Sequence, residues 1–189
     1  MRYGLIGPRE LPRIWDRHLL NGAAIGALIP RAVSVADVGS GAGLPGLALA
    51  IARPDLSVTL VDAAERRIAF LRQMTAQLDR PDVQIVRGRV DGTGPVVVDA
   101  RGQRHPVGPF DVVTARAVAP LVRLLPWLAG LARPGGLILA IKGESARAEL
   151  SVASGTMRDM GGIAQIVQLG MPGAAGVQVV RIDLTGAAR

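Results

Sequence analysis

The 189-residue sequence contains no cysteine, which excludes disulfide bonds, thiolate metal sites and a cysteine nucleophile. A reducing cytoplasm is therefore the simplest expected location. Long apolar runs are missing too, so we expect neither a membrane span nor a secretory signal. Aromatic residues make up only 3% of the chain, which argues against binding by extensive base stacking.

Basic residues outnumber acidic ones by 22 to 15, for a net charge of +7. This balance favours a polyanionic partner such as nucleic acid, although without a long basic run a merely basic domain stays open. The apolar share of 49% supports one substantial core. We expect one metal-free, monomeric domain over residues 1–189, with a helical cap at 1–30 and the core at 31–189.

Apolar periodicity predicts an α/β fold. Helical spacing over residues 11–28 predicts an amphipathic helix with Leu11 and Trp15 on its apolar stripe. Strands are then predicted at 32–38, 57–61, 83–86, 110–114 and 137–141, alternating with helices at 44–52, 64–78, 120–132 and 145–152. The helix at 64–78 should turn Ile68, Leu71 and Leu78 inward. Such alternation is typical of a doubly wound, mostly parallel sheet.

Two regions depart from the alternation. Residues 163–169 and 177–184 are rich in β-forming residues and predict a closing β-hairpin at the sheet edge. Residues 91–109 hold Gly, Pro, Asp and Arg around a short valine run, which predicts a loop or a short ribbon. A turn is expected at residues 133–136, before the last strand of the alternation.

A glycine-rich turn follows the first predicted core strand, in the run DVGSGAG at residues 37–43. Glycines there let a ligand approach the backbone, so Asp37, Ser40 and the glycines 39, 41 and 43 are candidate ligand contacts. The spacing is Gly-x-Gly-x-Gly, with Leu44 where a dinucleotide-binding fingerprint needs glycine. A nicotinamide enzyme is therefore disfavoured.

Asp62 follows the second predicted strand, 19 residues after Gly43. An acidic side chain there can accept hydrogen bonds from both hydroxyls of a ribose, so the turn and Asp62 together indicate an adenosine-containing ligand. The alternative is that the glycines only form a tight turn and that Asp62 caps the next helix.

Several runs resemble the RsmG (GidB) family over nearly the whole chain. They are GLIGPRE (residues 4–10), WDRHLLN (15–21), DVGSGAGLPG (37–46), RGR (87–89), FDVVTARA (110–117) and IKGE (141–144). The resemblance implies a Rossmann-like class I S-adenosylmethionine-dependent methyltransferase fold. It also implies methylation of N7 of a guanine in the 530 loop of 16S ribosomal RNA, in the small ribosomal subunit.

The resemblance also implies particular contacts to the S-adenosylmethionine cofactor. Gly39 and Leu44 would lie against the methyl donor, Val90 and Asp91 beside its adenine, and Arg116 near its methionine end. Two positions depart from the family pattern: Val90-Asp91 replaces the usual Ala-Glu, and Asp62 stands where Glu is more frequent. Both keep a carboxylate. Family members also usually carry several dozen helical residues before GLIGPRE, so the amino terminus looks truncated.

Basic residues near predicted strand ends are candidates for positioning the substrate. Arg116 and Lys142 both follow strands of the sheet, where open α/β sheets bind ligands. An ordinary ion pair for Arg116 and a solvated lysine are the structural alternatives.

The predicted first helix offers a second set of candidates. Arg13 and Arg17 lie one turn apart and, with Arg9, could bind RNA phosphates. His18 and Trp15 could stack on a base, but a hydrogen-bonded histidine and a core tryptophan are the favoured interpretations.

The chemistry needs few side chains, because guanine N7 offers a lone pair without losing a proton and methyl transfer depends on positioning. No general base is required of a chain whose two histidines are His18 and His105. Adenine amino-group methylation would call for an Asn/Asp-Pro-Pro-aromatic run, whereas residues 114–117 read TARA. A small-molecule methyltransferase and a non-catalytic RNA-binding assembly factor remain the alternatives.

Overall fold

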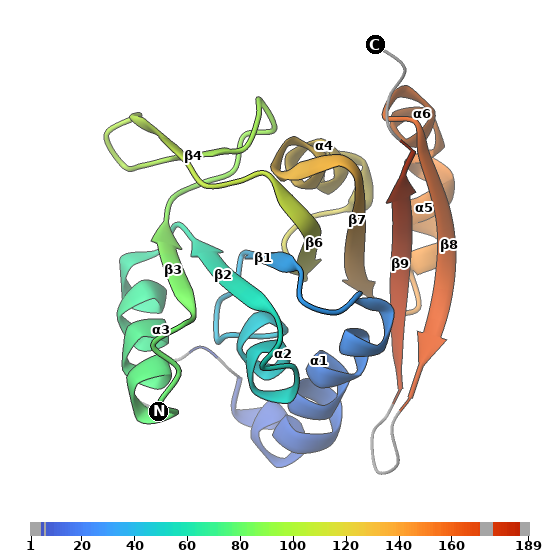
Figure 1. The fold of residues 1–189 in the computed structure, drawn as a ribbon. Coiled ribbons are helices and arrows are strands. Elements are labelled where there is room, and N and C mark those ends of the chain that lie inside the picture. Colours follow the sequence, from blue (N-terminus) through green and yellow to red (C-terminus); the bar gives the residue numbers. More distant parts are fainter. Residues whose placement is uncertain (1–4, 6, 171–175, 186–189) are drawn as a thin grey trace.

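The computed structural model describes residues 5, 7–170 and 176–185 (Figure 1). The strands are β1 (Ser34–Val38), β2 (Ser57–Asp62), β3 (Gln84–Arg87), β4 (Val96–Val98), β5 (Arg104–Pro106), β6 (Phe110–Arg116), β7 (Ala132–Lys142), β8 (Gly162–Leu169) and β9 (Val177–Leu184). The helices are η1 (Pro8–Arg13), η2 (Ile14–Leu19), α1 (Leu20–Ala24), η3 (Ile25–Leu28), α2 (Gly46–Ala52), α3 (Glu65–Gln77), α4 (Leu121–Leu131), α5 (Ala146–Val152) and α6 (Ser154–Asp159).

A seven-stranded sheet in the order β3-β2-β1-β6-β7-β9-β8 forms the centre of the molecule. In this sheet the neighbouring strands β3, β2, β1, β6 and β7 run parallel to one another, and β9 is antiparallel to both β7 and β8. The predicted doubly wound sheet with a closing hairpin is therefore confirmed. The chain changes direction along the sheet between β1 and β6, and ligands of open α/β sheets bind at such a switch point.

Each face of the sheet buries its own apolar core, because successive strand residues point to opposite faces. One core joins the strands to η3, α2 and α3, through residues such as Ile25, Leu49 and Leu71. The other packs β6, β7 and β9 against α4, α5 and α6, with Leu124, Leu128 and Met157 among its members. Figure 1 shows the two helical layers on opposite sides of the strands.

The amino-terminal segment departs from the predicted single helix. Residues 8–28 form a 3-10 helix, a π-helix, a short α-helix and a second 3-10 helix in succession, with Pro12 inside the first. Proline lacks the N–H that continuous helical bonding needs at this position. Trp15 is 70% exposed, so the core interpretation of this tryptophan was wrong. Leu11 is also exposed, while Ile25 is fully buried.

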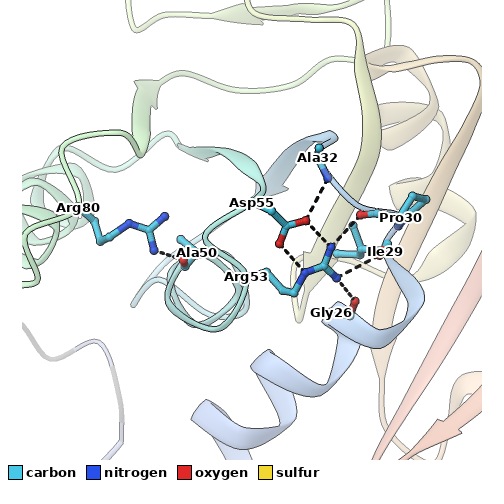
Figure 2. Close-up of polar contacts among 8 residues, drawn as sticks. All are labelled: Gly26, Ile29, Pro30, Ala32, Ala50, Arg53, Asp55 and Arg80. Carbon is cyan, nitrogen blue, oxygen red and sulfur yellow. Dashed lines mark hydrogen bonds and ion pairs between the residues drawn. The ribbon is translucent and has the colours of Figure 1, made fainter.

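Arg53, just after α2, fastens this segment to the sheet (Figure 2). Its guanidinium donates to the carbonyl oxygens of Gly26 at 2.6 Å, Ile29 at 3.1 Å and Pro30 at 3.0 Å. Two further bonds of 2.7 Å reach the Asp55 carboxylate. All five N–H groups of the side chain are thus used, three on backbone carbonyls at and just after the end of η3 and two on the Asp55 carboxylate.

Other boundaries differ locally from prediction. β7 begins at Ala132, so the expected turn at residues 133–136 lies inside the strand, where its pairing with β6 shifts register. α6 was not predicted. Leu78 follows α3 and is 39% exposed, contrary to its predicted inward position. Residues 91–109 contain the antiparallel β4–β5 ribbon, as expected.

No helix among the described residues is long and apolar enough to cross a membrane.

Candidate functional site

The glycine turn after β1 depends on glycine at all three positions. Gly39, Gly41 and Gly43 have φ angles of 71°, 55° and 82°, a region that side chains disfavour. A Cβ on Gly39 would lie 2.6 Å from Val118, whereas one on Gly41 would meet only a carbonyl oxygen at 3.7 Å. The backbone at Gly41 is therefore open to a ligand.

Asp37 lies fully buried at the end of β1, beneath the turn. One carboxylate oxygen accepts the N–H of Gly46 at 3.0 Å, while the other has no hydrogen-bond partner among the described residues. Burial raises the pKa of Asp37 to about 7, against the lowering effect of the Gly46 bond. A cationic group bound beside the turn would offset this unfavourable burial of charge.

Asp62 lies at the end of β2 and connects the turn to α3. Its carboxylate accepts the N–H groups of Gly41 at 3.0 Å and Ala64 at 2.9 Å, and pairs with Arg67 at 3.3 Å. The bond to Ala64 closes a turn just before α3 and caps no N–H of the helix itself, whose N-cap is Ala64. A carboxylate offers about four acceptor sites, so these contacts leave room for a ribose hydroxyl.

Arg116 ends β6, beside the carboxyl end of β1. It is half-buried, and burial together with repulsion from Arg17 lowers its pKa from the usual arginine value. Its guanidinium lies 2.6 Å from Nδ1 of His18, whose Nε2 lies 2.8 Å from Glu10. No ion pair involves Arg116 within the described ranges, so the ion-pair alternative was wrong. The hydrogen-bonded interpretation of His18 is confirmed.

Lys142 ends β7 and is only 8% exposed, so the alternative of a solvated lysine was wrong. Its ammonium donates to the Ala119 carbonyl at 2.7 Å and pairs with Glu149 at 2.8 Å. Burial opposes ionisation of Glu149, but hydrogen bonds from Lys142 and from the Leu121 N–H lower its pKa overall. The pair holds the chain between β6 and α4.

A polar cavity of about 790 Å³ opens between these elements. Arg13, Arg17, Arg116 and Lys142 all line it, so four of the predicted basic residues come together. Ser145 and the glutamines at 168 and 178 are among the other lining residues. Arg13 and Arg17 are exposed on one face, as predicted.

A second, apolar cavity of about 710 Å³ lies between the amino-terminal helices and α2 and α3. Gly43 and Leu44 line it together with Trp15 and Leu78, which explains the exposure of these two large side chains. The cofactor candidates Gly43 and Leu44 thus face a different cavity from Arg116.

The remaining candidates stay apart from both cavities. Val90 packs against the core on the α4 side, and Asp91 accepts hydrogen bonds from Thr93 and Arg104 in the ribbon region. Ser40 is buried and donates to the Asp37 carbonyl. The side chain of Arg9 lies outside the described residues. In the described part of the chain, no three His, Cys, Asp or Glu side chains group as metal ligands would.

Sequence reasoning missed three polar residues of the site. Glu10 and Glu149 pair with His18 and Lys142, and Asn21 donates to carbonyls of Arg17 and Gly176. Helical spacing gives no signal for the Glu10–His18 pair, because residues eight apart in one α-helix lie about 12 Å apart along its axis. The contact between Asn21 and Gly176 spans 155 residues and leaves no local signal.

A family model and similar proteins from bacteria match most of this chain. Residues 1–171 match the model of the GidB family, described as rRNA small subunit methyltransferase G. A protein named ribosomal RNA small subunit methyltransferase G from Salinispora tropica is 56% identical over 160 residues, covering 84% of this chain and 64% of its own length. One of the same name from Kineococcus radiotolerans is 48% identical over 182 residues, covering 95% and 67%. The chain thus spans about two thirds of these relatives.

Solved structures support the fold alone. A ribosomal protein L11 methylase from Lactobacillus delbrueckii aligns with a TM-score of 0.64 at 17% identity, covering 87% of this chain and 76% of its own. A methyltransferase from Pyrococcus furiosus aligns at 0.63 and 17%, covering 86% and 80%. The fold is that of class I S-adenosylmethionine-dependent methyltransferases. By its family match and its close relatives, the chain belongs to the GidB family, rRNA small subunit methyltransferase G.

Proposed function

We propose that this protein transfers a methyl group from S-adenosylmethionine to N7 of a guanine in the 530 loop of 16S ribosomal RNA. The observation that carries the proposal is the placement of the open glycine turn and the basic polar cavity at one edge of the sheet. Membership of the GidB family, and relatives named as methyltransferases of small-subunit ribosomal RNA, support the choice of substrate.

The residues around the turn suit S-adenosylmethionine. When bound, this cofactor supplies a methyl carbon activated by a sulfonium. Gly41 leaves backbone accessible, Asp62 can accept a ribose hydroxyl, and the unpaired oxygen of Asp37 favours a nearby cation. The donor carries two cationic groups, the sulfonium and the amino group, so the charge on Asp37 matches its chemistry.

The site residues act by binding and positioning. Guanine N7 attacks with its own lone pair, so no side chain has to remove a proton from it. Both nitrogens of His18 are already engaged by Glu10 and Arg116, which fits a structural task better than proton transfer. Arg116 and Lys142 are the candidates for holding the substrate, with Lys142 acting mainly through the chain segment that it orders.

Arg13 and Arg17, with Arg9 as a further candidate, form the proposed RNA edge. Both lie at the rim of the polar cavity and are exposed, so a phosphate can reach them. Arg17 is paired with Glu10 at 3.3 Å, an exposed pair that costs little to open.

Radiolabelled S-adenosylmethionine tests the proposal. The protein is incubated separately with naked 16S RNA, small subunits, tRNA and a set of small-molecule methyl acceptors. We expect label only in 16S RNA or small subunits. Tight cofactor binding without transfer to any RNA would instead support an assembly factor, and transfer to a small molecule would support the other alternative. Tight binding of NAD, with no binding of S-adenosylmethionine, would reject the proposed methyltransferase and the small-molecule methyltransferase alike.

A further inference from the structure

Three side chains from three elements form a continuous hydrogen-bonded line into the polar cavity. Glu10 of η1 contacts His18 Nε2 at 2.8 Å, and His18 Nδ1 contacts an Arg116 Nη at 2.6 Å. His18 and Arg116 lie 98 residues apart in the sequence. The side chain of His18 is only 12% exposed, so water does not readily replace either contact.

The chemistry of the two neighbours fixes the proton on His18. A guanidinium has only N–H donors, so the ring nitrogen facing Arg116 has to be the acceptor. A carboxylate facing the other nitrogen accepts its N–H, and the His18 bond accordingly lowers the pKa of Glu10. His18 is therefore a neutral ring protonated on Nε2.

This arrangement leaves the charge of Arg116 uncompensated. Two of the other cations at the cavity are balanced, since Arg17 pairs with Glu10 and Lys142 with Glu149. Arg13 also lines the cavity and is exposed on η1, and the carboxylates of Glu10 and Asp37 act on Arg116 only through longer-range attraction. A neutral acceptor orients the guanidinium without neutralising it, whereas a carboxylate partner would do both.

We propose that Glu10 and His18 are positioning residues that hold Arg116 as an unpaired cation, ready to bind an oxyanion that enters the polar cavity. The oxyanion chemistry is common to an RNA phosphate and to the carboxylate of the methyl donor. The hydrogen-bonded line stands on geometry alone, whereas its role in substrate or donor binding rests on the function proposed above.

Nitrogen NMR of the histidine rings tests the line without any ligand. The chain has two histidines, and His105, exposed and beside Asp99, serves as the internal reference. At neutral pH we expect His18 Nδ1 to resonate as an unprotonated nitrogen and Nε2 as a protonated one. In Arg116→Met the proton should stay on Nε2, because Glu10 still accepts it. A wild-type His18 protonated on Nδ1 would overturn the proposal.

Two matched substitutions test the positioning role. In His18→Asn, the amide oxygen takes the place of Nδ1, so the acceptor for Arg116 is kept. In His18→Gln, the amide lies one bond further out, at the place of Nε2, so the contact with Glu10 is kept and the acceptor is lost. We expect kcat/KM for RNA methylation to fall about ten-fold in His18→Gln, the value of one lost hydrogen bond, and to stay within about three-fold of wild type in His18→Asn.

Separate affinities identify the oxyanion. A loss in His18→Gln confined to S-adenosylmethionine affinity, measured by calorimetry, assigns Arg116 to the donor carboxylate. A loss confined to RNA affinity assigns it to a phosphate. Equal losses of rate in both variants, in step with equal losses of thermal stability, would show a structural role only and would overturn the proposal. If wild-type protein transfers no methyl group, the proposed function fails while the NMR result still decides the hydrogen-bonded line.

Discussion

Gly41 has a φ of 55° and leaves open space beside its Cα. Gly41→Val should therefore abolish S-adenosylmethionine binding, because the branched side chain fills this opening and strains the turn by about 1–3 kcal/mol. Gly102→Val is the matched control, since Gly102 has a φ of 79° and open surroundings, and lies in the turn between β4 and β5. Calorimetry on both variants separates a blocked cofactor contact, expected only in Gly41→Val, from backbone strain, expected in both. If a folded Gly41→Val protein binds the cofactor with unchanged affinity, the turn has only a structural role.

Asp37 should make stability fall as pH rises. Its folded-state pKa of about 7 lies above the ordinary value of 3.8, so the folded protein holds a proton that the unfolded chain releases between these values. The penalty is absent below about pH 4 and complete above about pH 7. Relative to Asp37→Asn, which cannot ionise, wild type should lose about 1–3 kcal/mol between about pH 5 and pH 8. Urea denaturation at several pH values measures the free energy of unfolding of both proteins. Parallel pH profiles of wild type and Asp37→Asn would refute the prediction.

The residues of the site were predictable where a local pattern defines them. The glycine spacing gave three positive φ angles, and strand ends located Asp37, Asp62 and Arg116. The partners of these groups were not predictable, because the contact of Arg116 with His18 depends on packing between elements far apart in sequence. Burial of Lys142 has a more local origin, since Glu149 comes from the following helix α5, but it too depends on how that helix packs against the sheet.

At the scale of elements, the chain uses one local motif, Arg-x-Asp, in different surroundings. Arg53 and Asp55 hold the end of η3, whereas Arg181 and Asp183 form a pair along β9 whose side chains are 30% and 46% exposed. Arg53 also donates to three backbone carbonyls, so the Arg53–Asp55 pair should contribute more to the stability of the fold than the Arg181–Asp183 pair.

Arg53→Met should lower the free energy of unfolding by about 2–4 kcal/mol, because it removes the donor of three carbonyl groups and leaves Asp55 with the Ala32 N–H but without its cation. The matched change Arg181→Met should cost no more than about 1 kcal/mol, as expected for an exposed pair. Urea denaturation at neutral pH compares the two. Equal losses would mean that the carbonyl contacts of Arg53 add nothing.

Element prediction succeeded in the sheet and failed at the amino terminus for physical reasons. Short valine-rich runs with helices between them have few alternatives to parallel strands. The apolar spacing of residues 11–28 is compatible with one helix, but Pro12 interrupts the bonding and the apolar stripe faces a cavity, not the core. α6 follows α5 after one residue, so the sequence offered no clear boundary between them.

For the whole molecule, the net charge of +7 matters only where it is concentrated. Replacing Arg13 and Arg17 with Gln should weaken RNA binding and flatten its salt dependence by about 1.5 in log–log slope, from 0.7 to 0.9 for each phosphate contact. Cofactor affinity should not change. The control replaces Arg72 and Arg158, exposed arginines that line neither cavity, and removes the same two charges. An identical slope change in both double variants would make the effect one of net charge alone.

Mapping the modified base is the most direct test of the proposed activity. Small subunits, or 16S RNA, are methylated by the purified protein, and borohydride reduction followed by aniline treatment then cleaves the RNA at N7-methylguanine. We expect one enzyme-dependent cleavage, at a guanine of the 530 loop, that disappears with Gly41→Val. Transfer of methyl groups without any such cleavage, or cleavage at a guanine elsewhere in the RNA, would contradict the proposed activity.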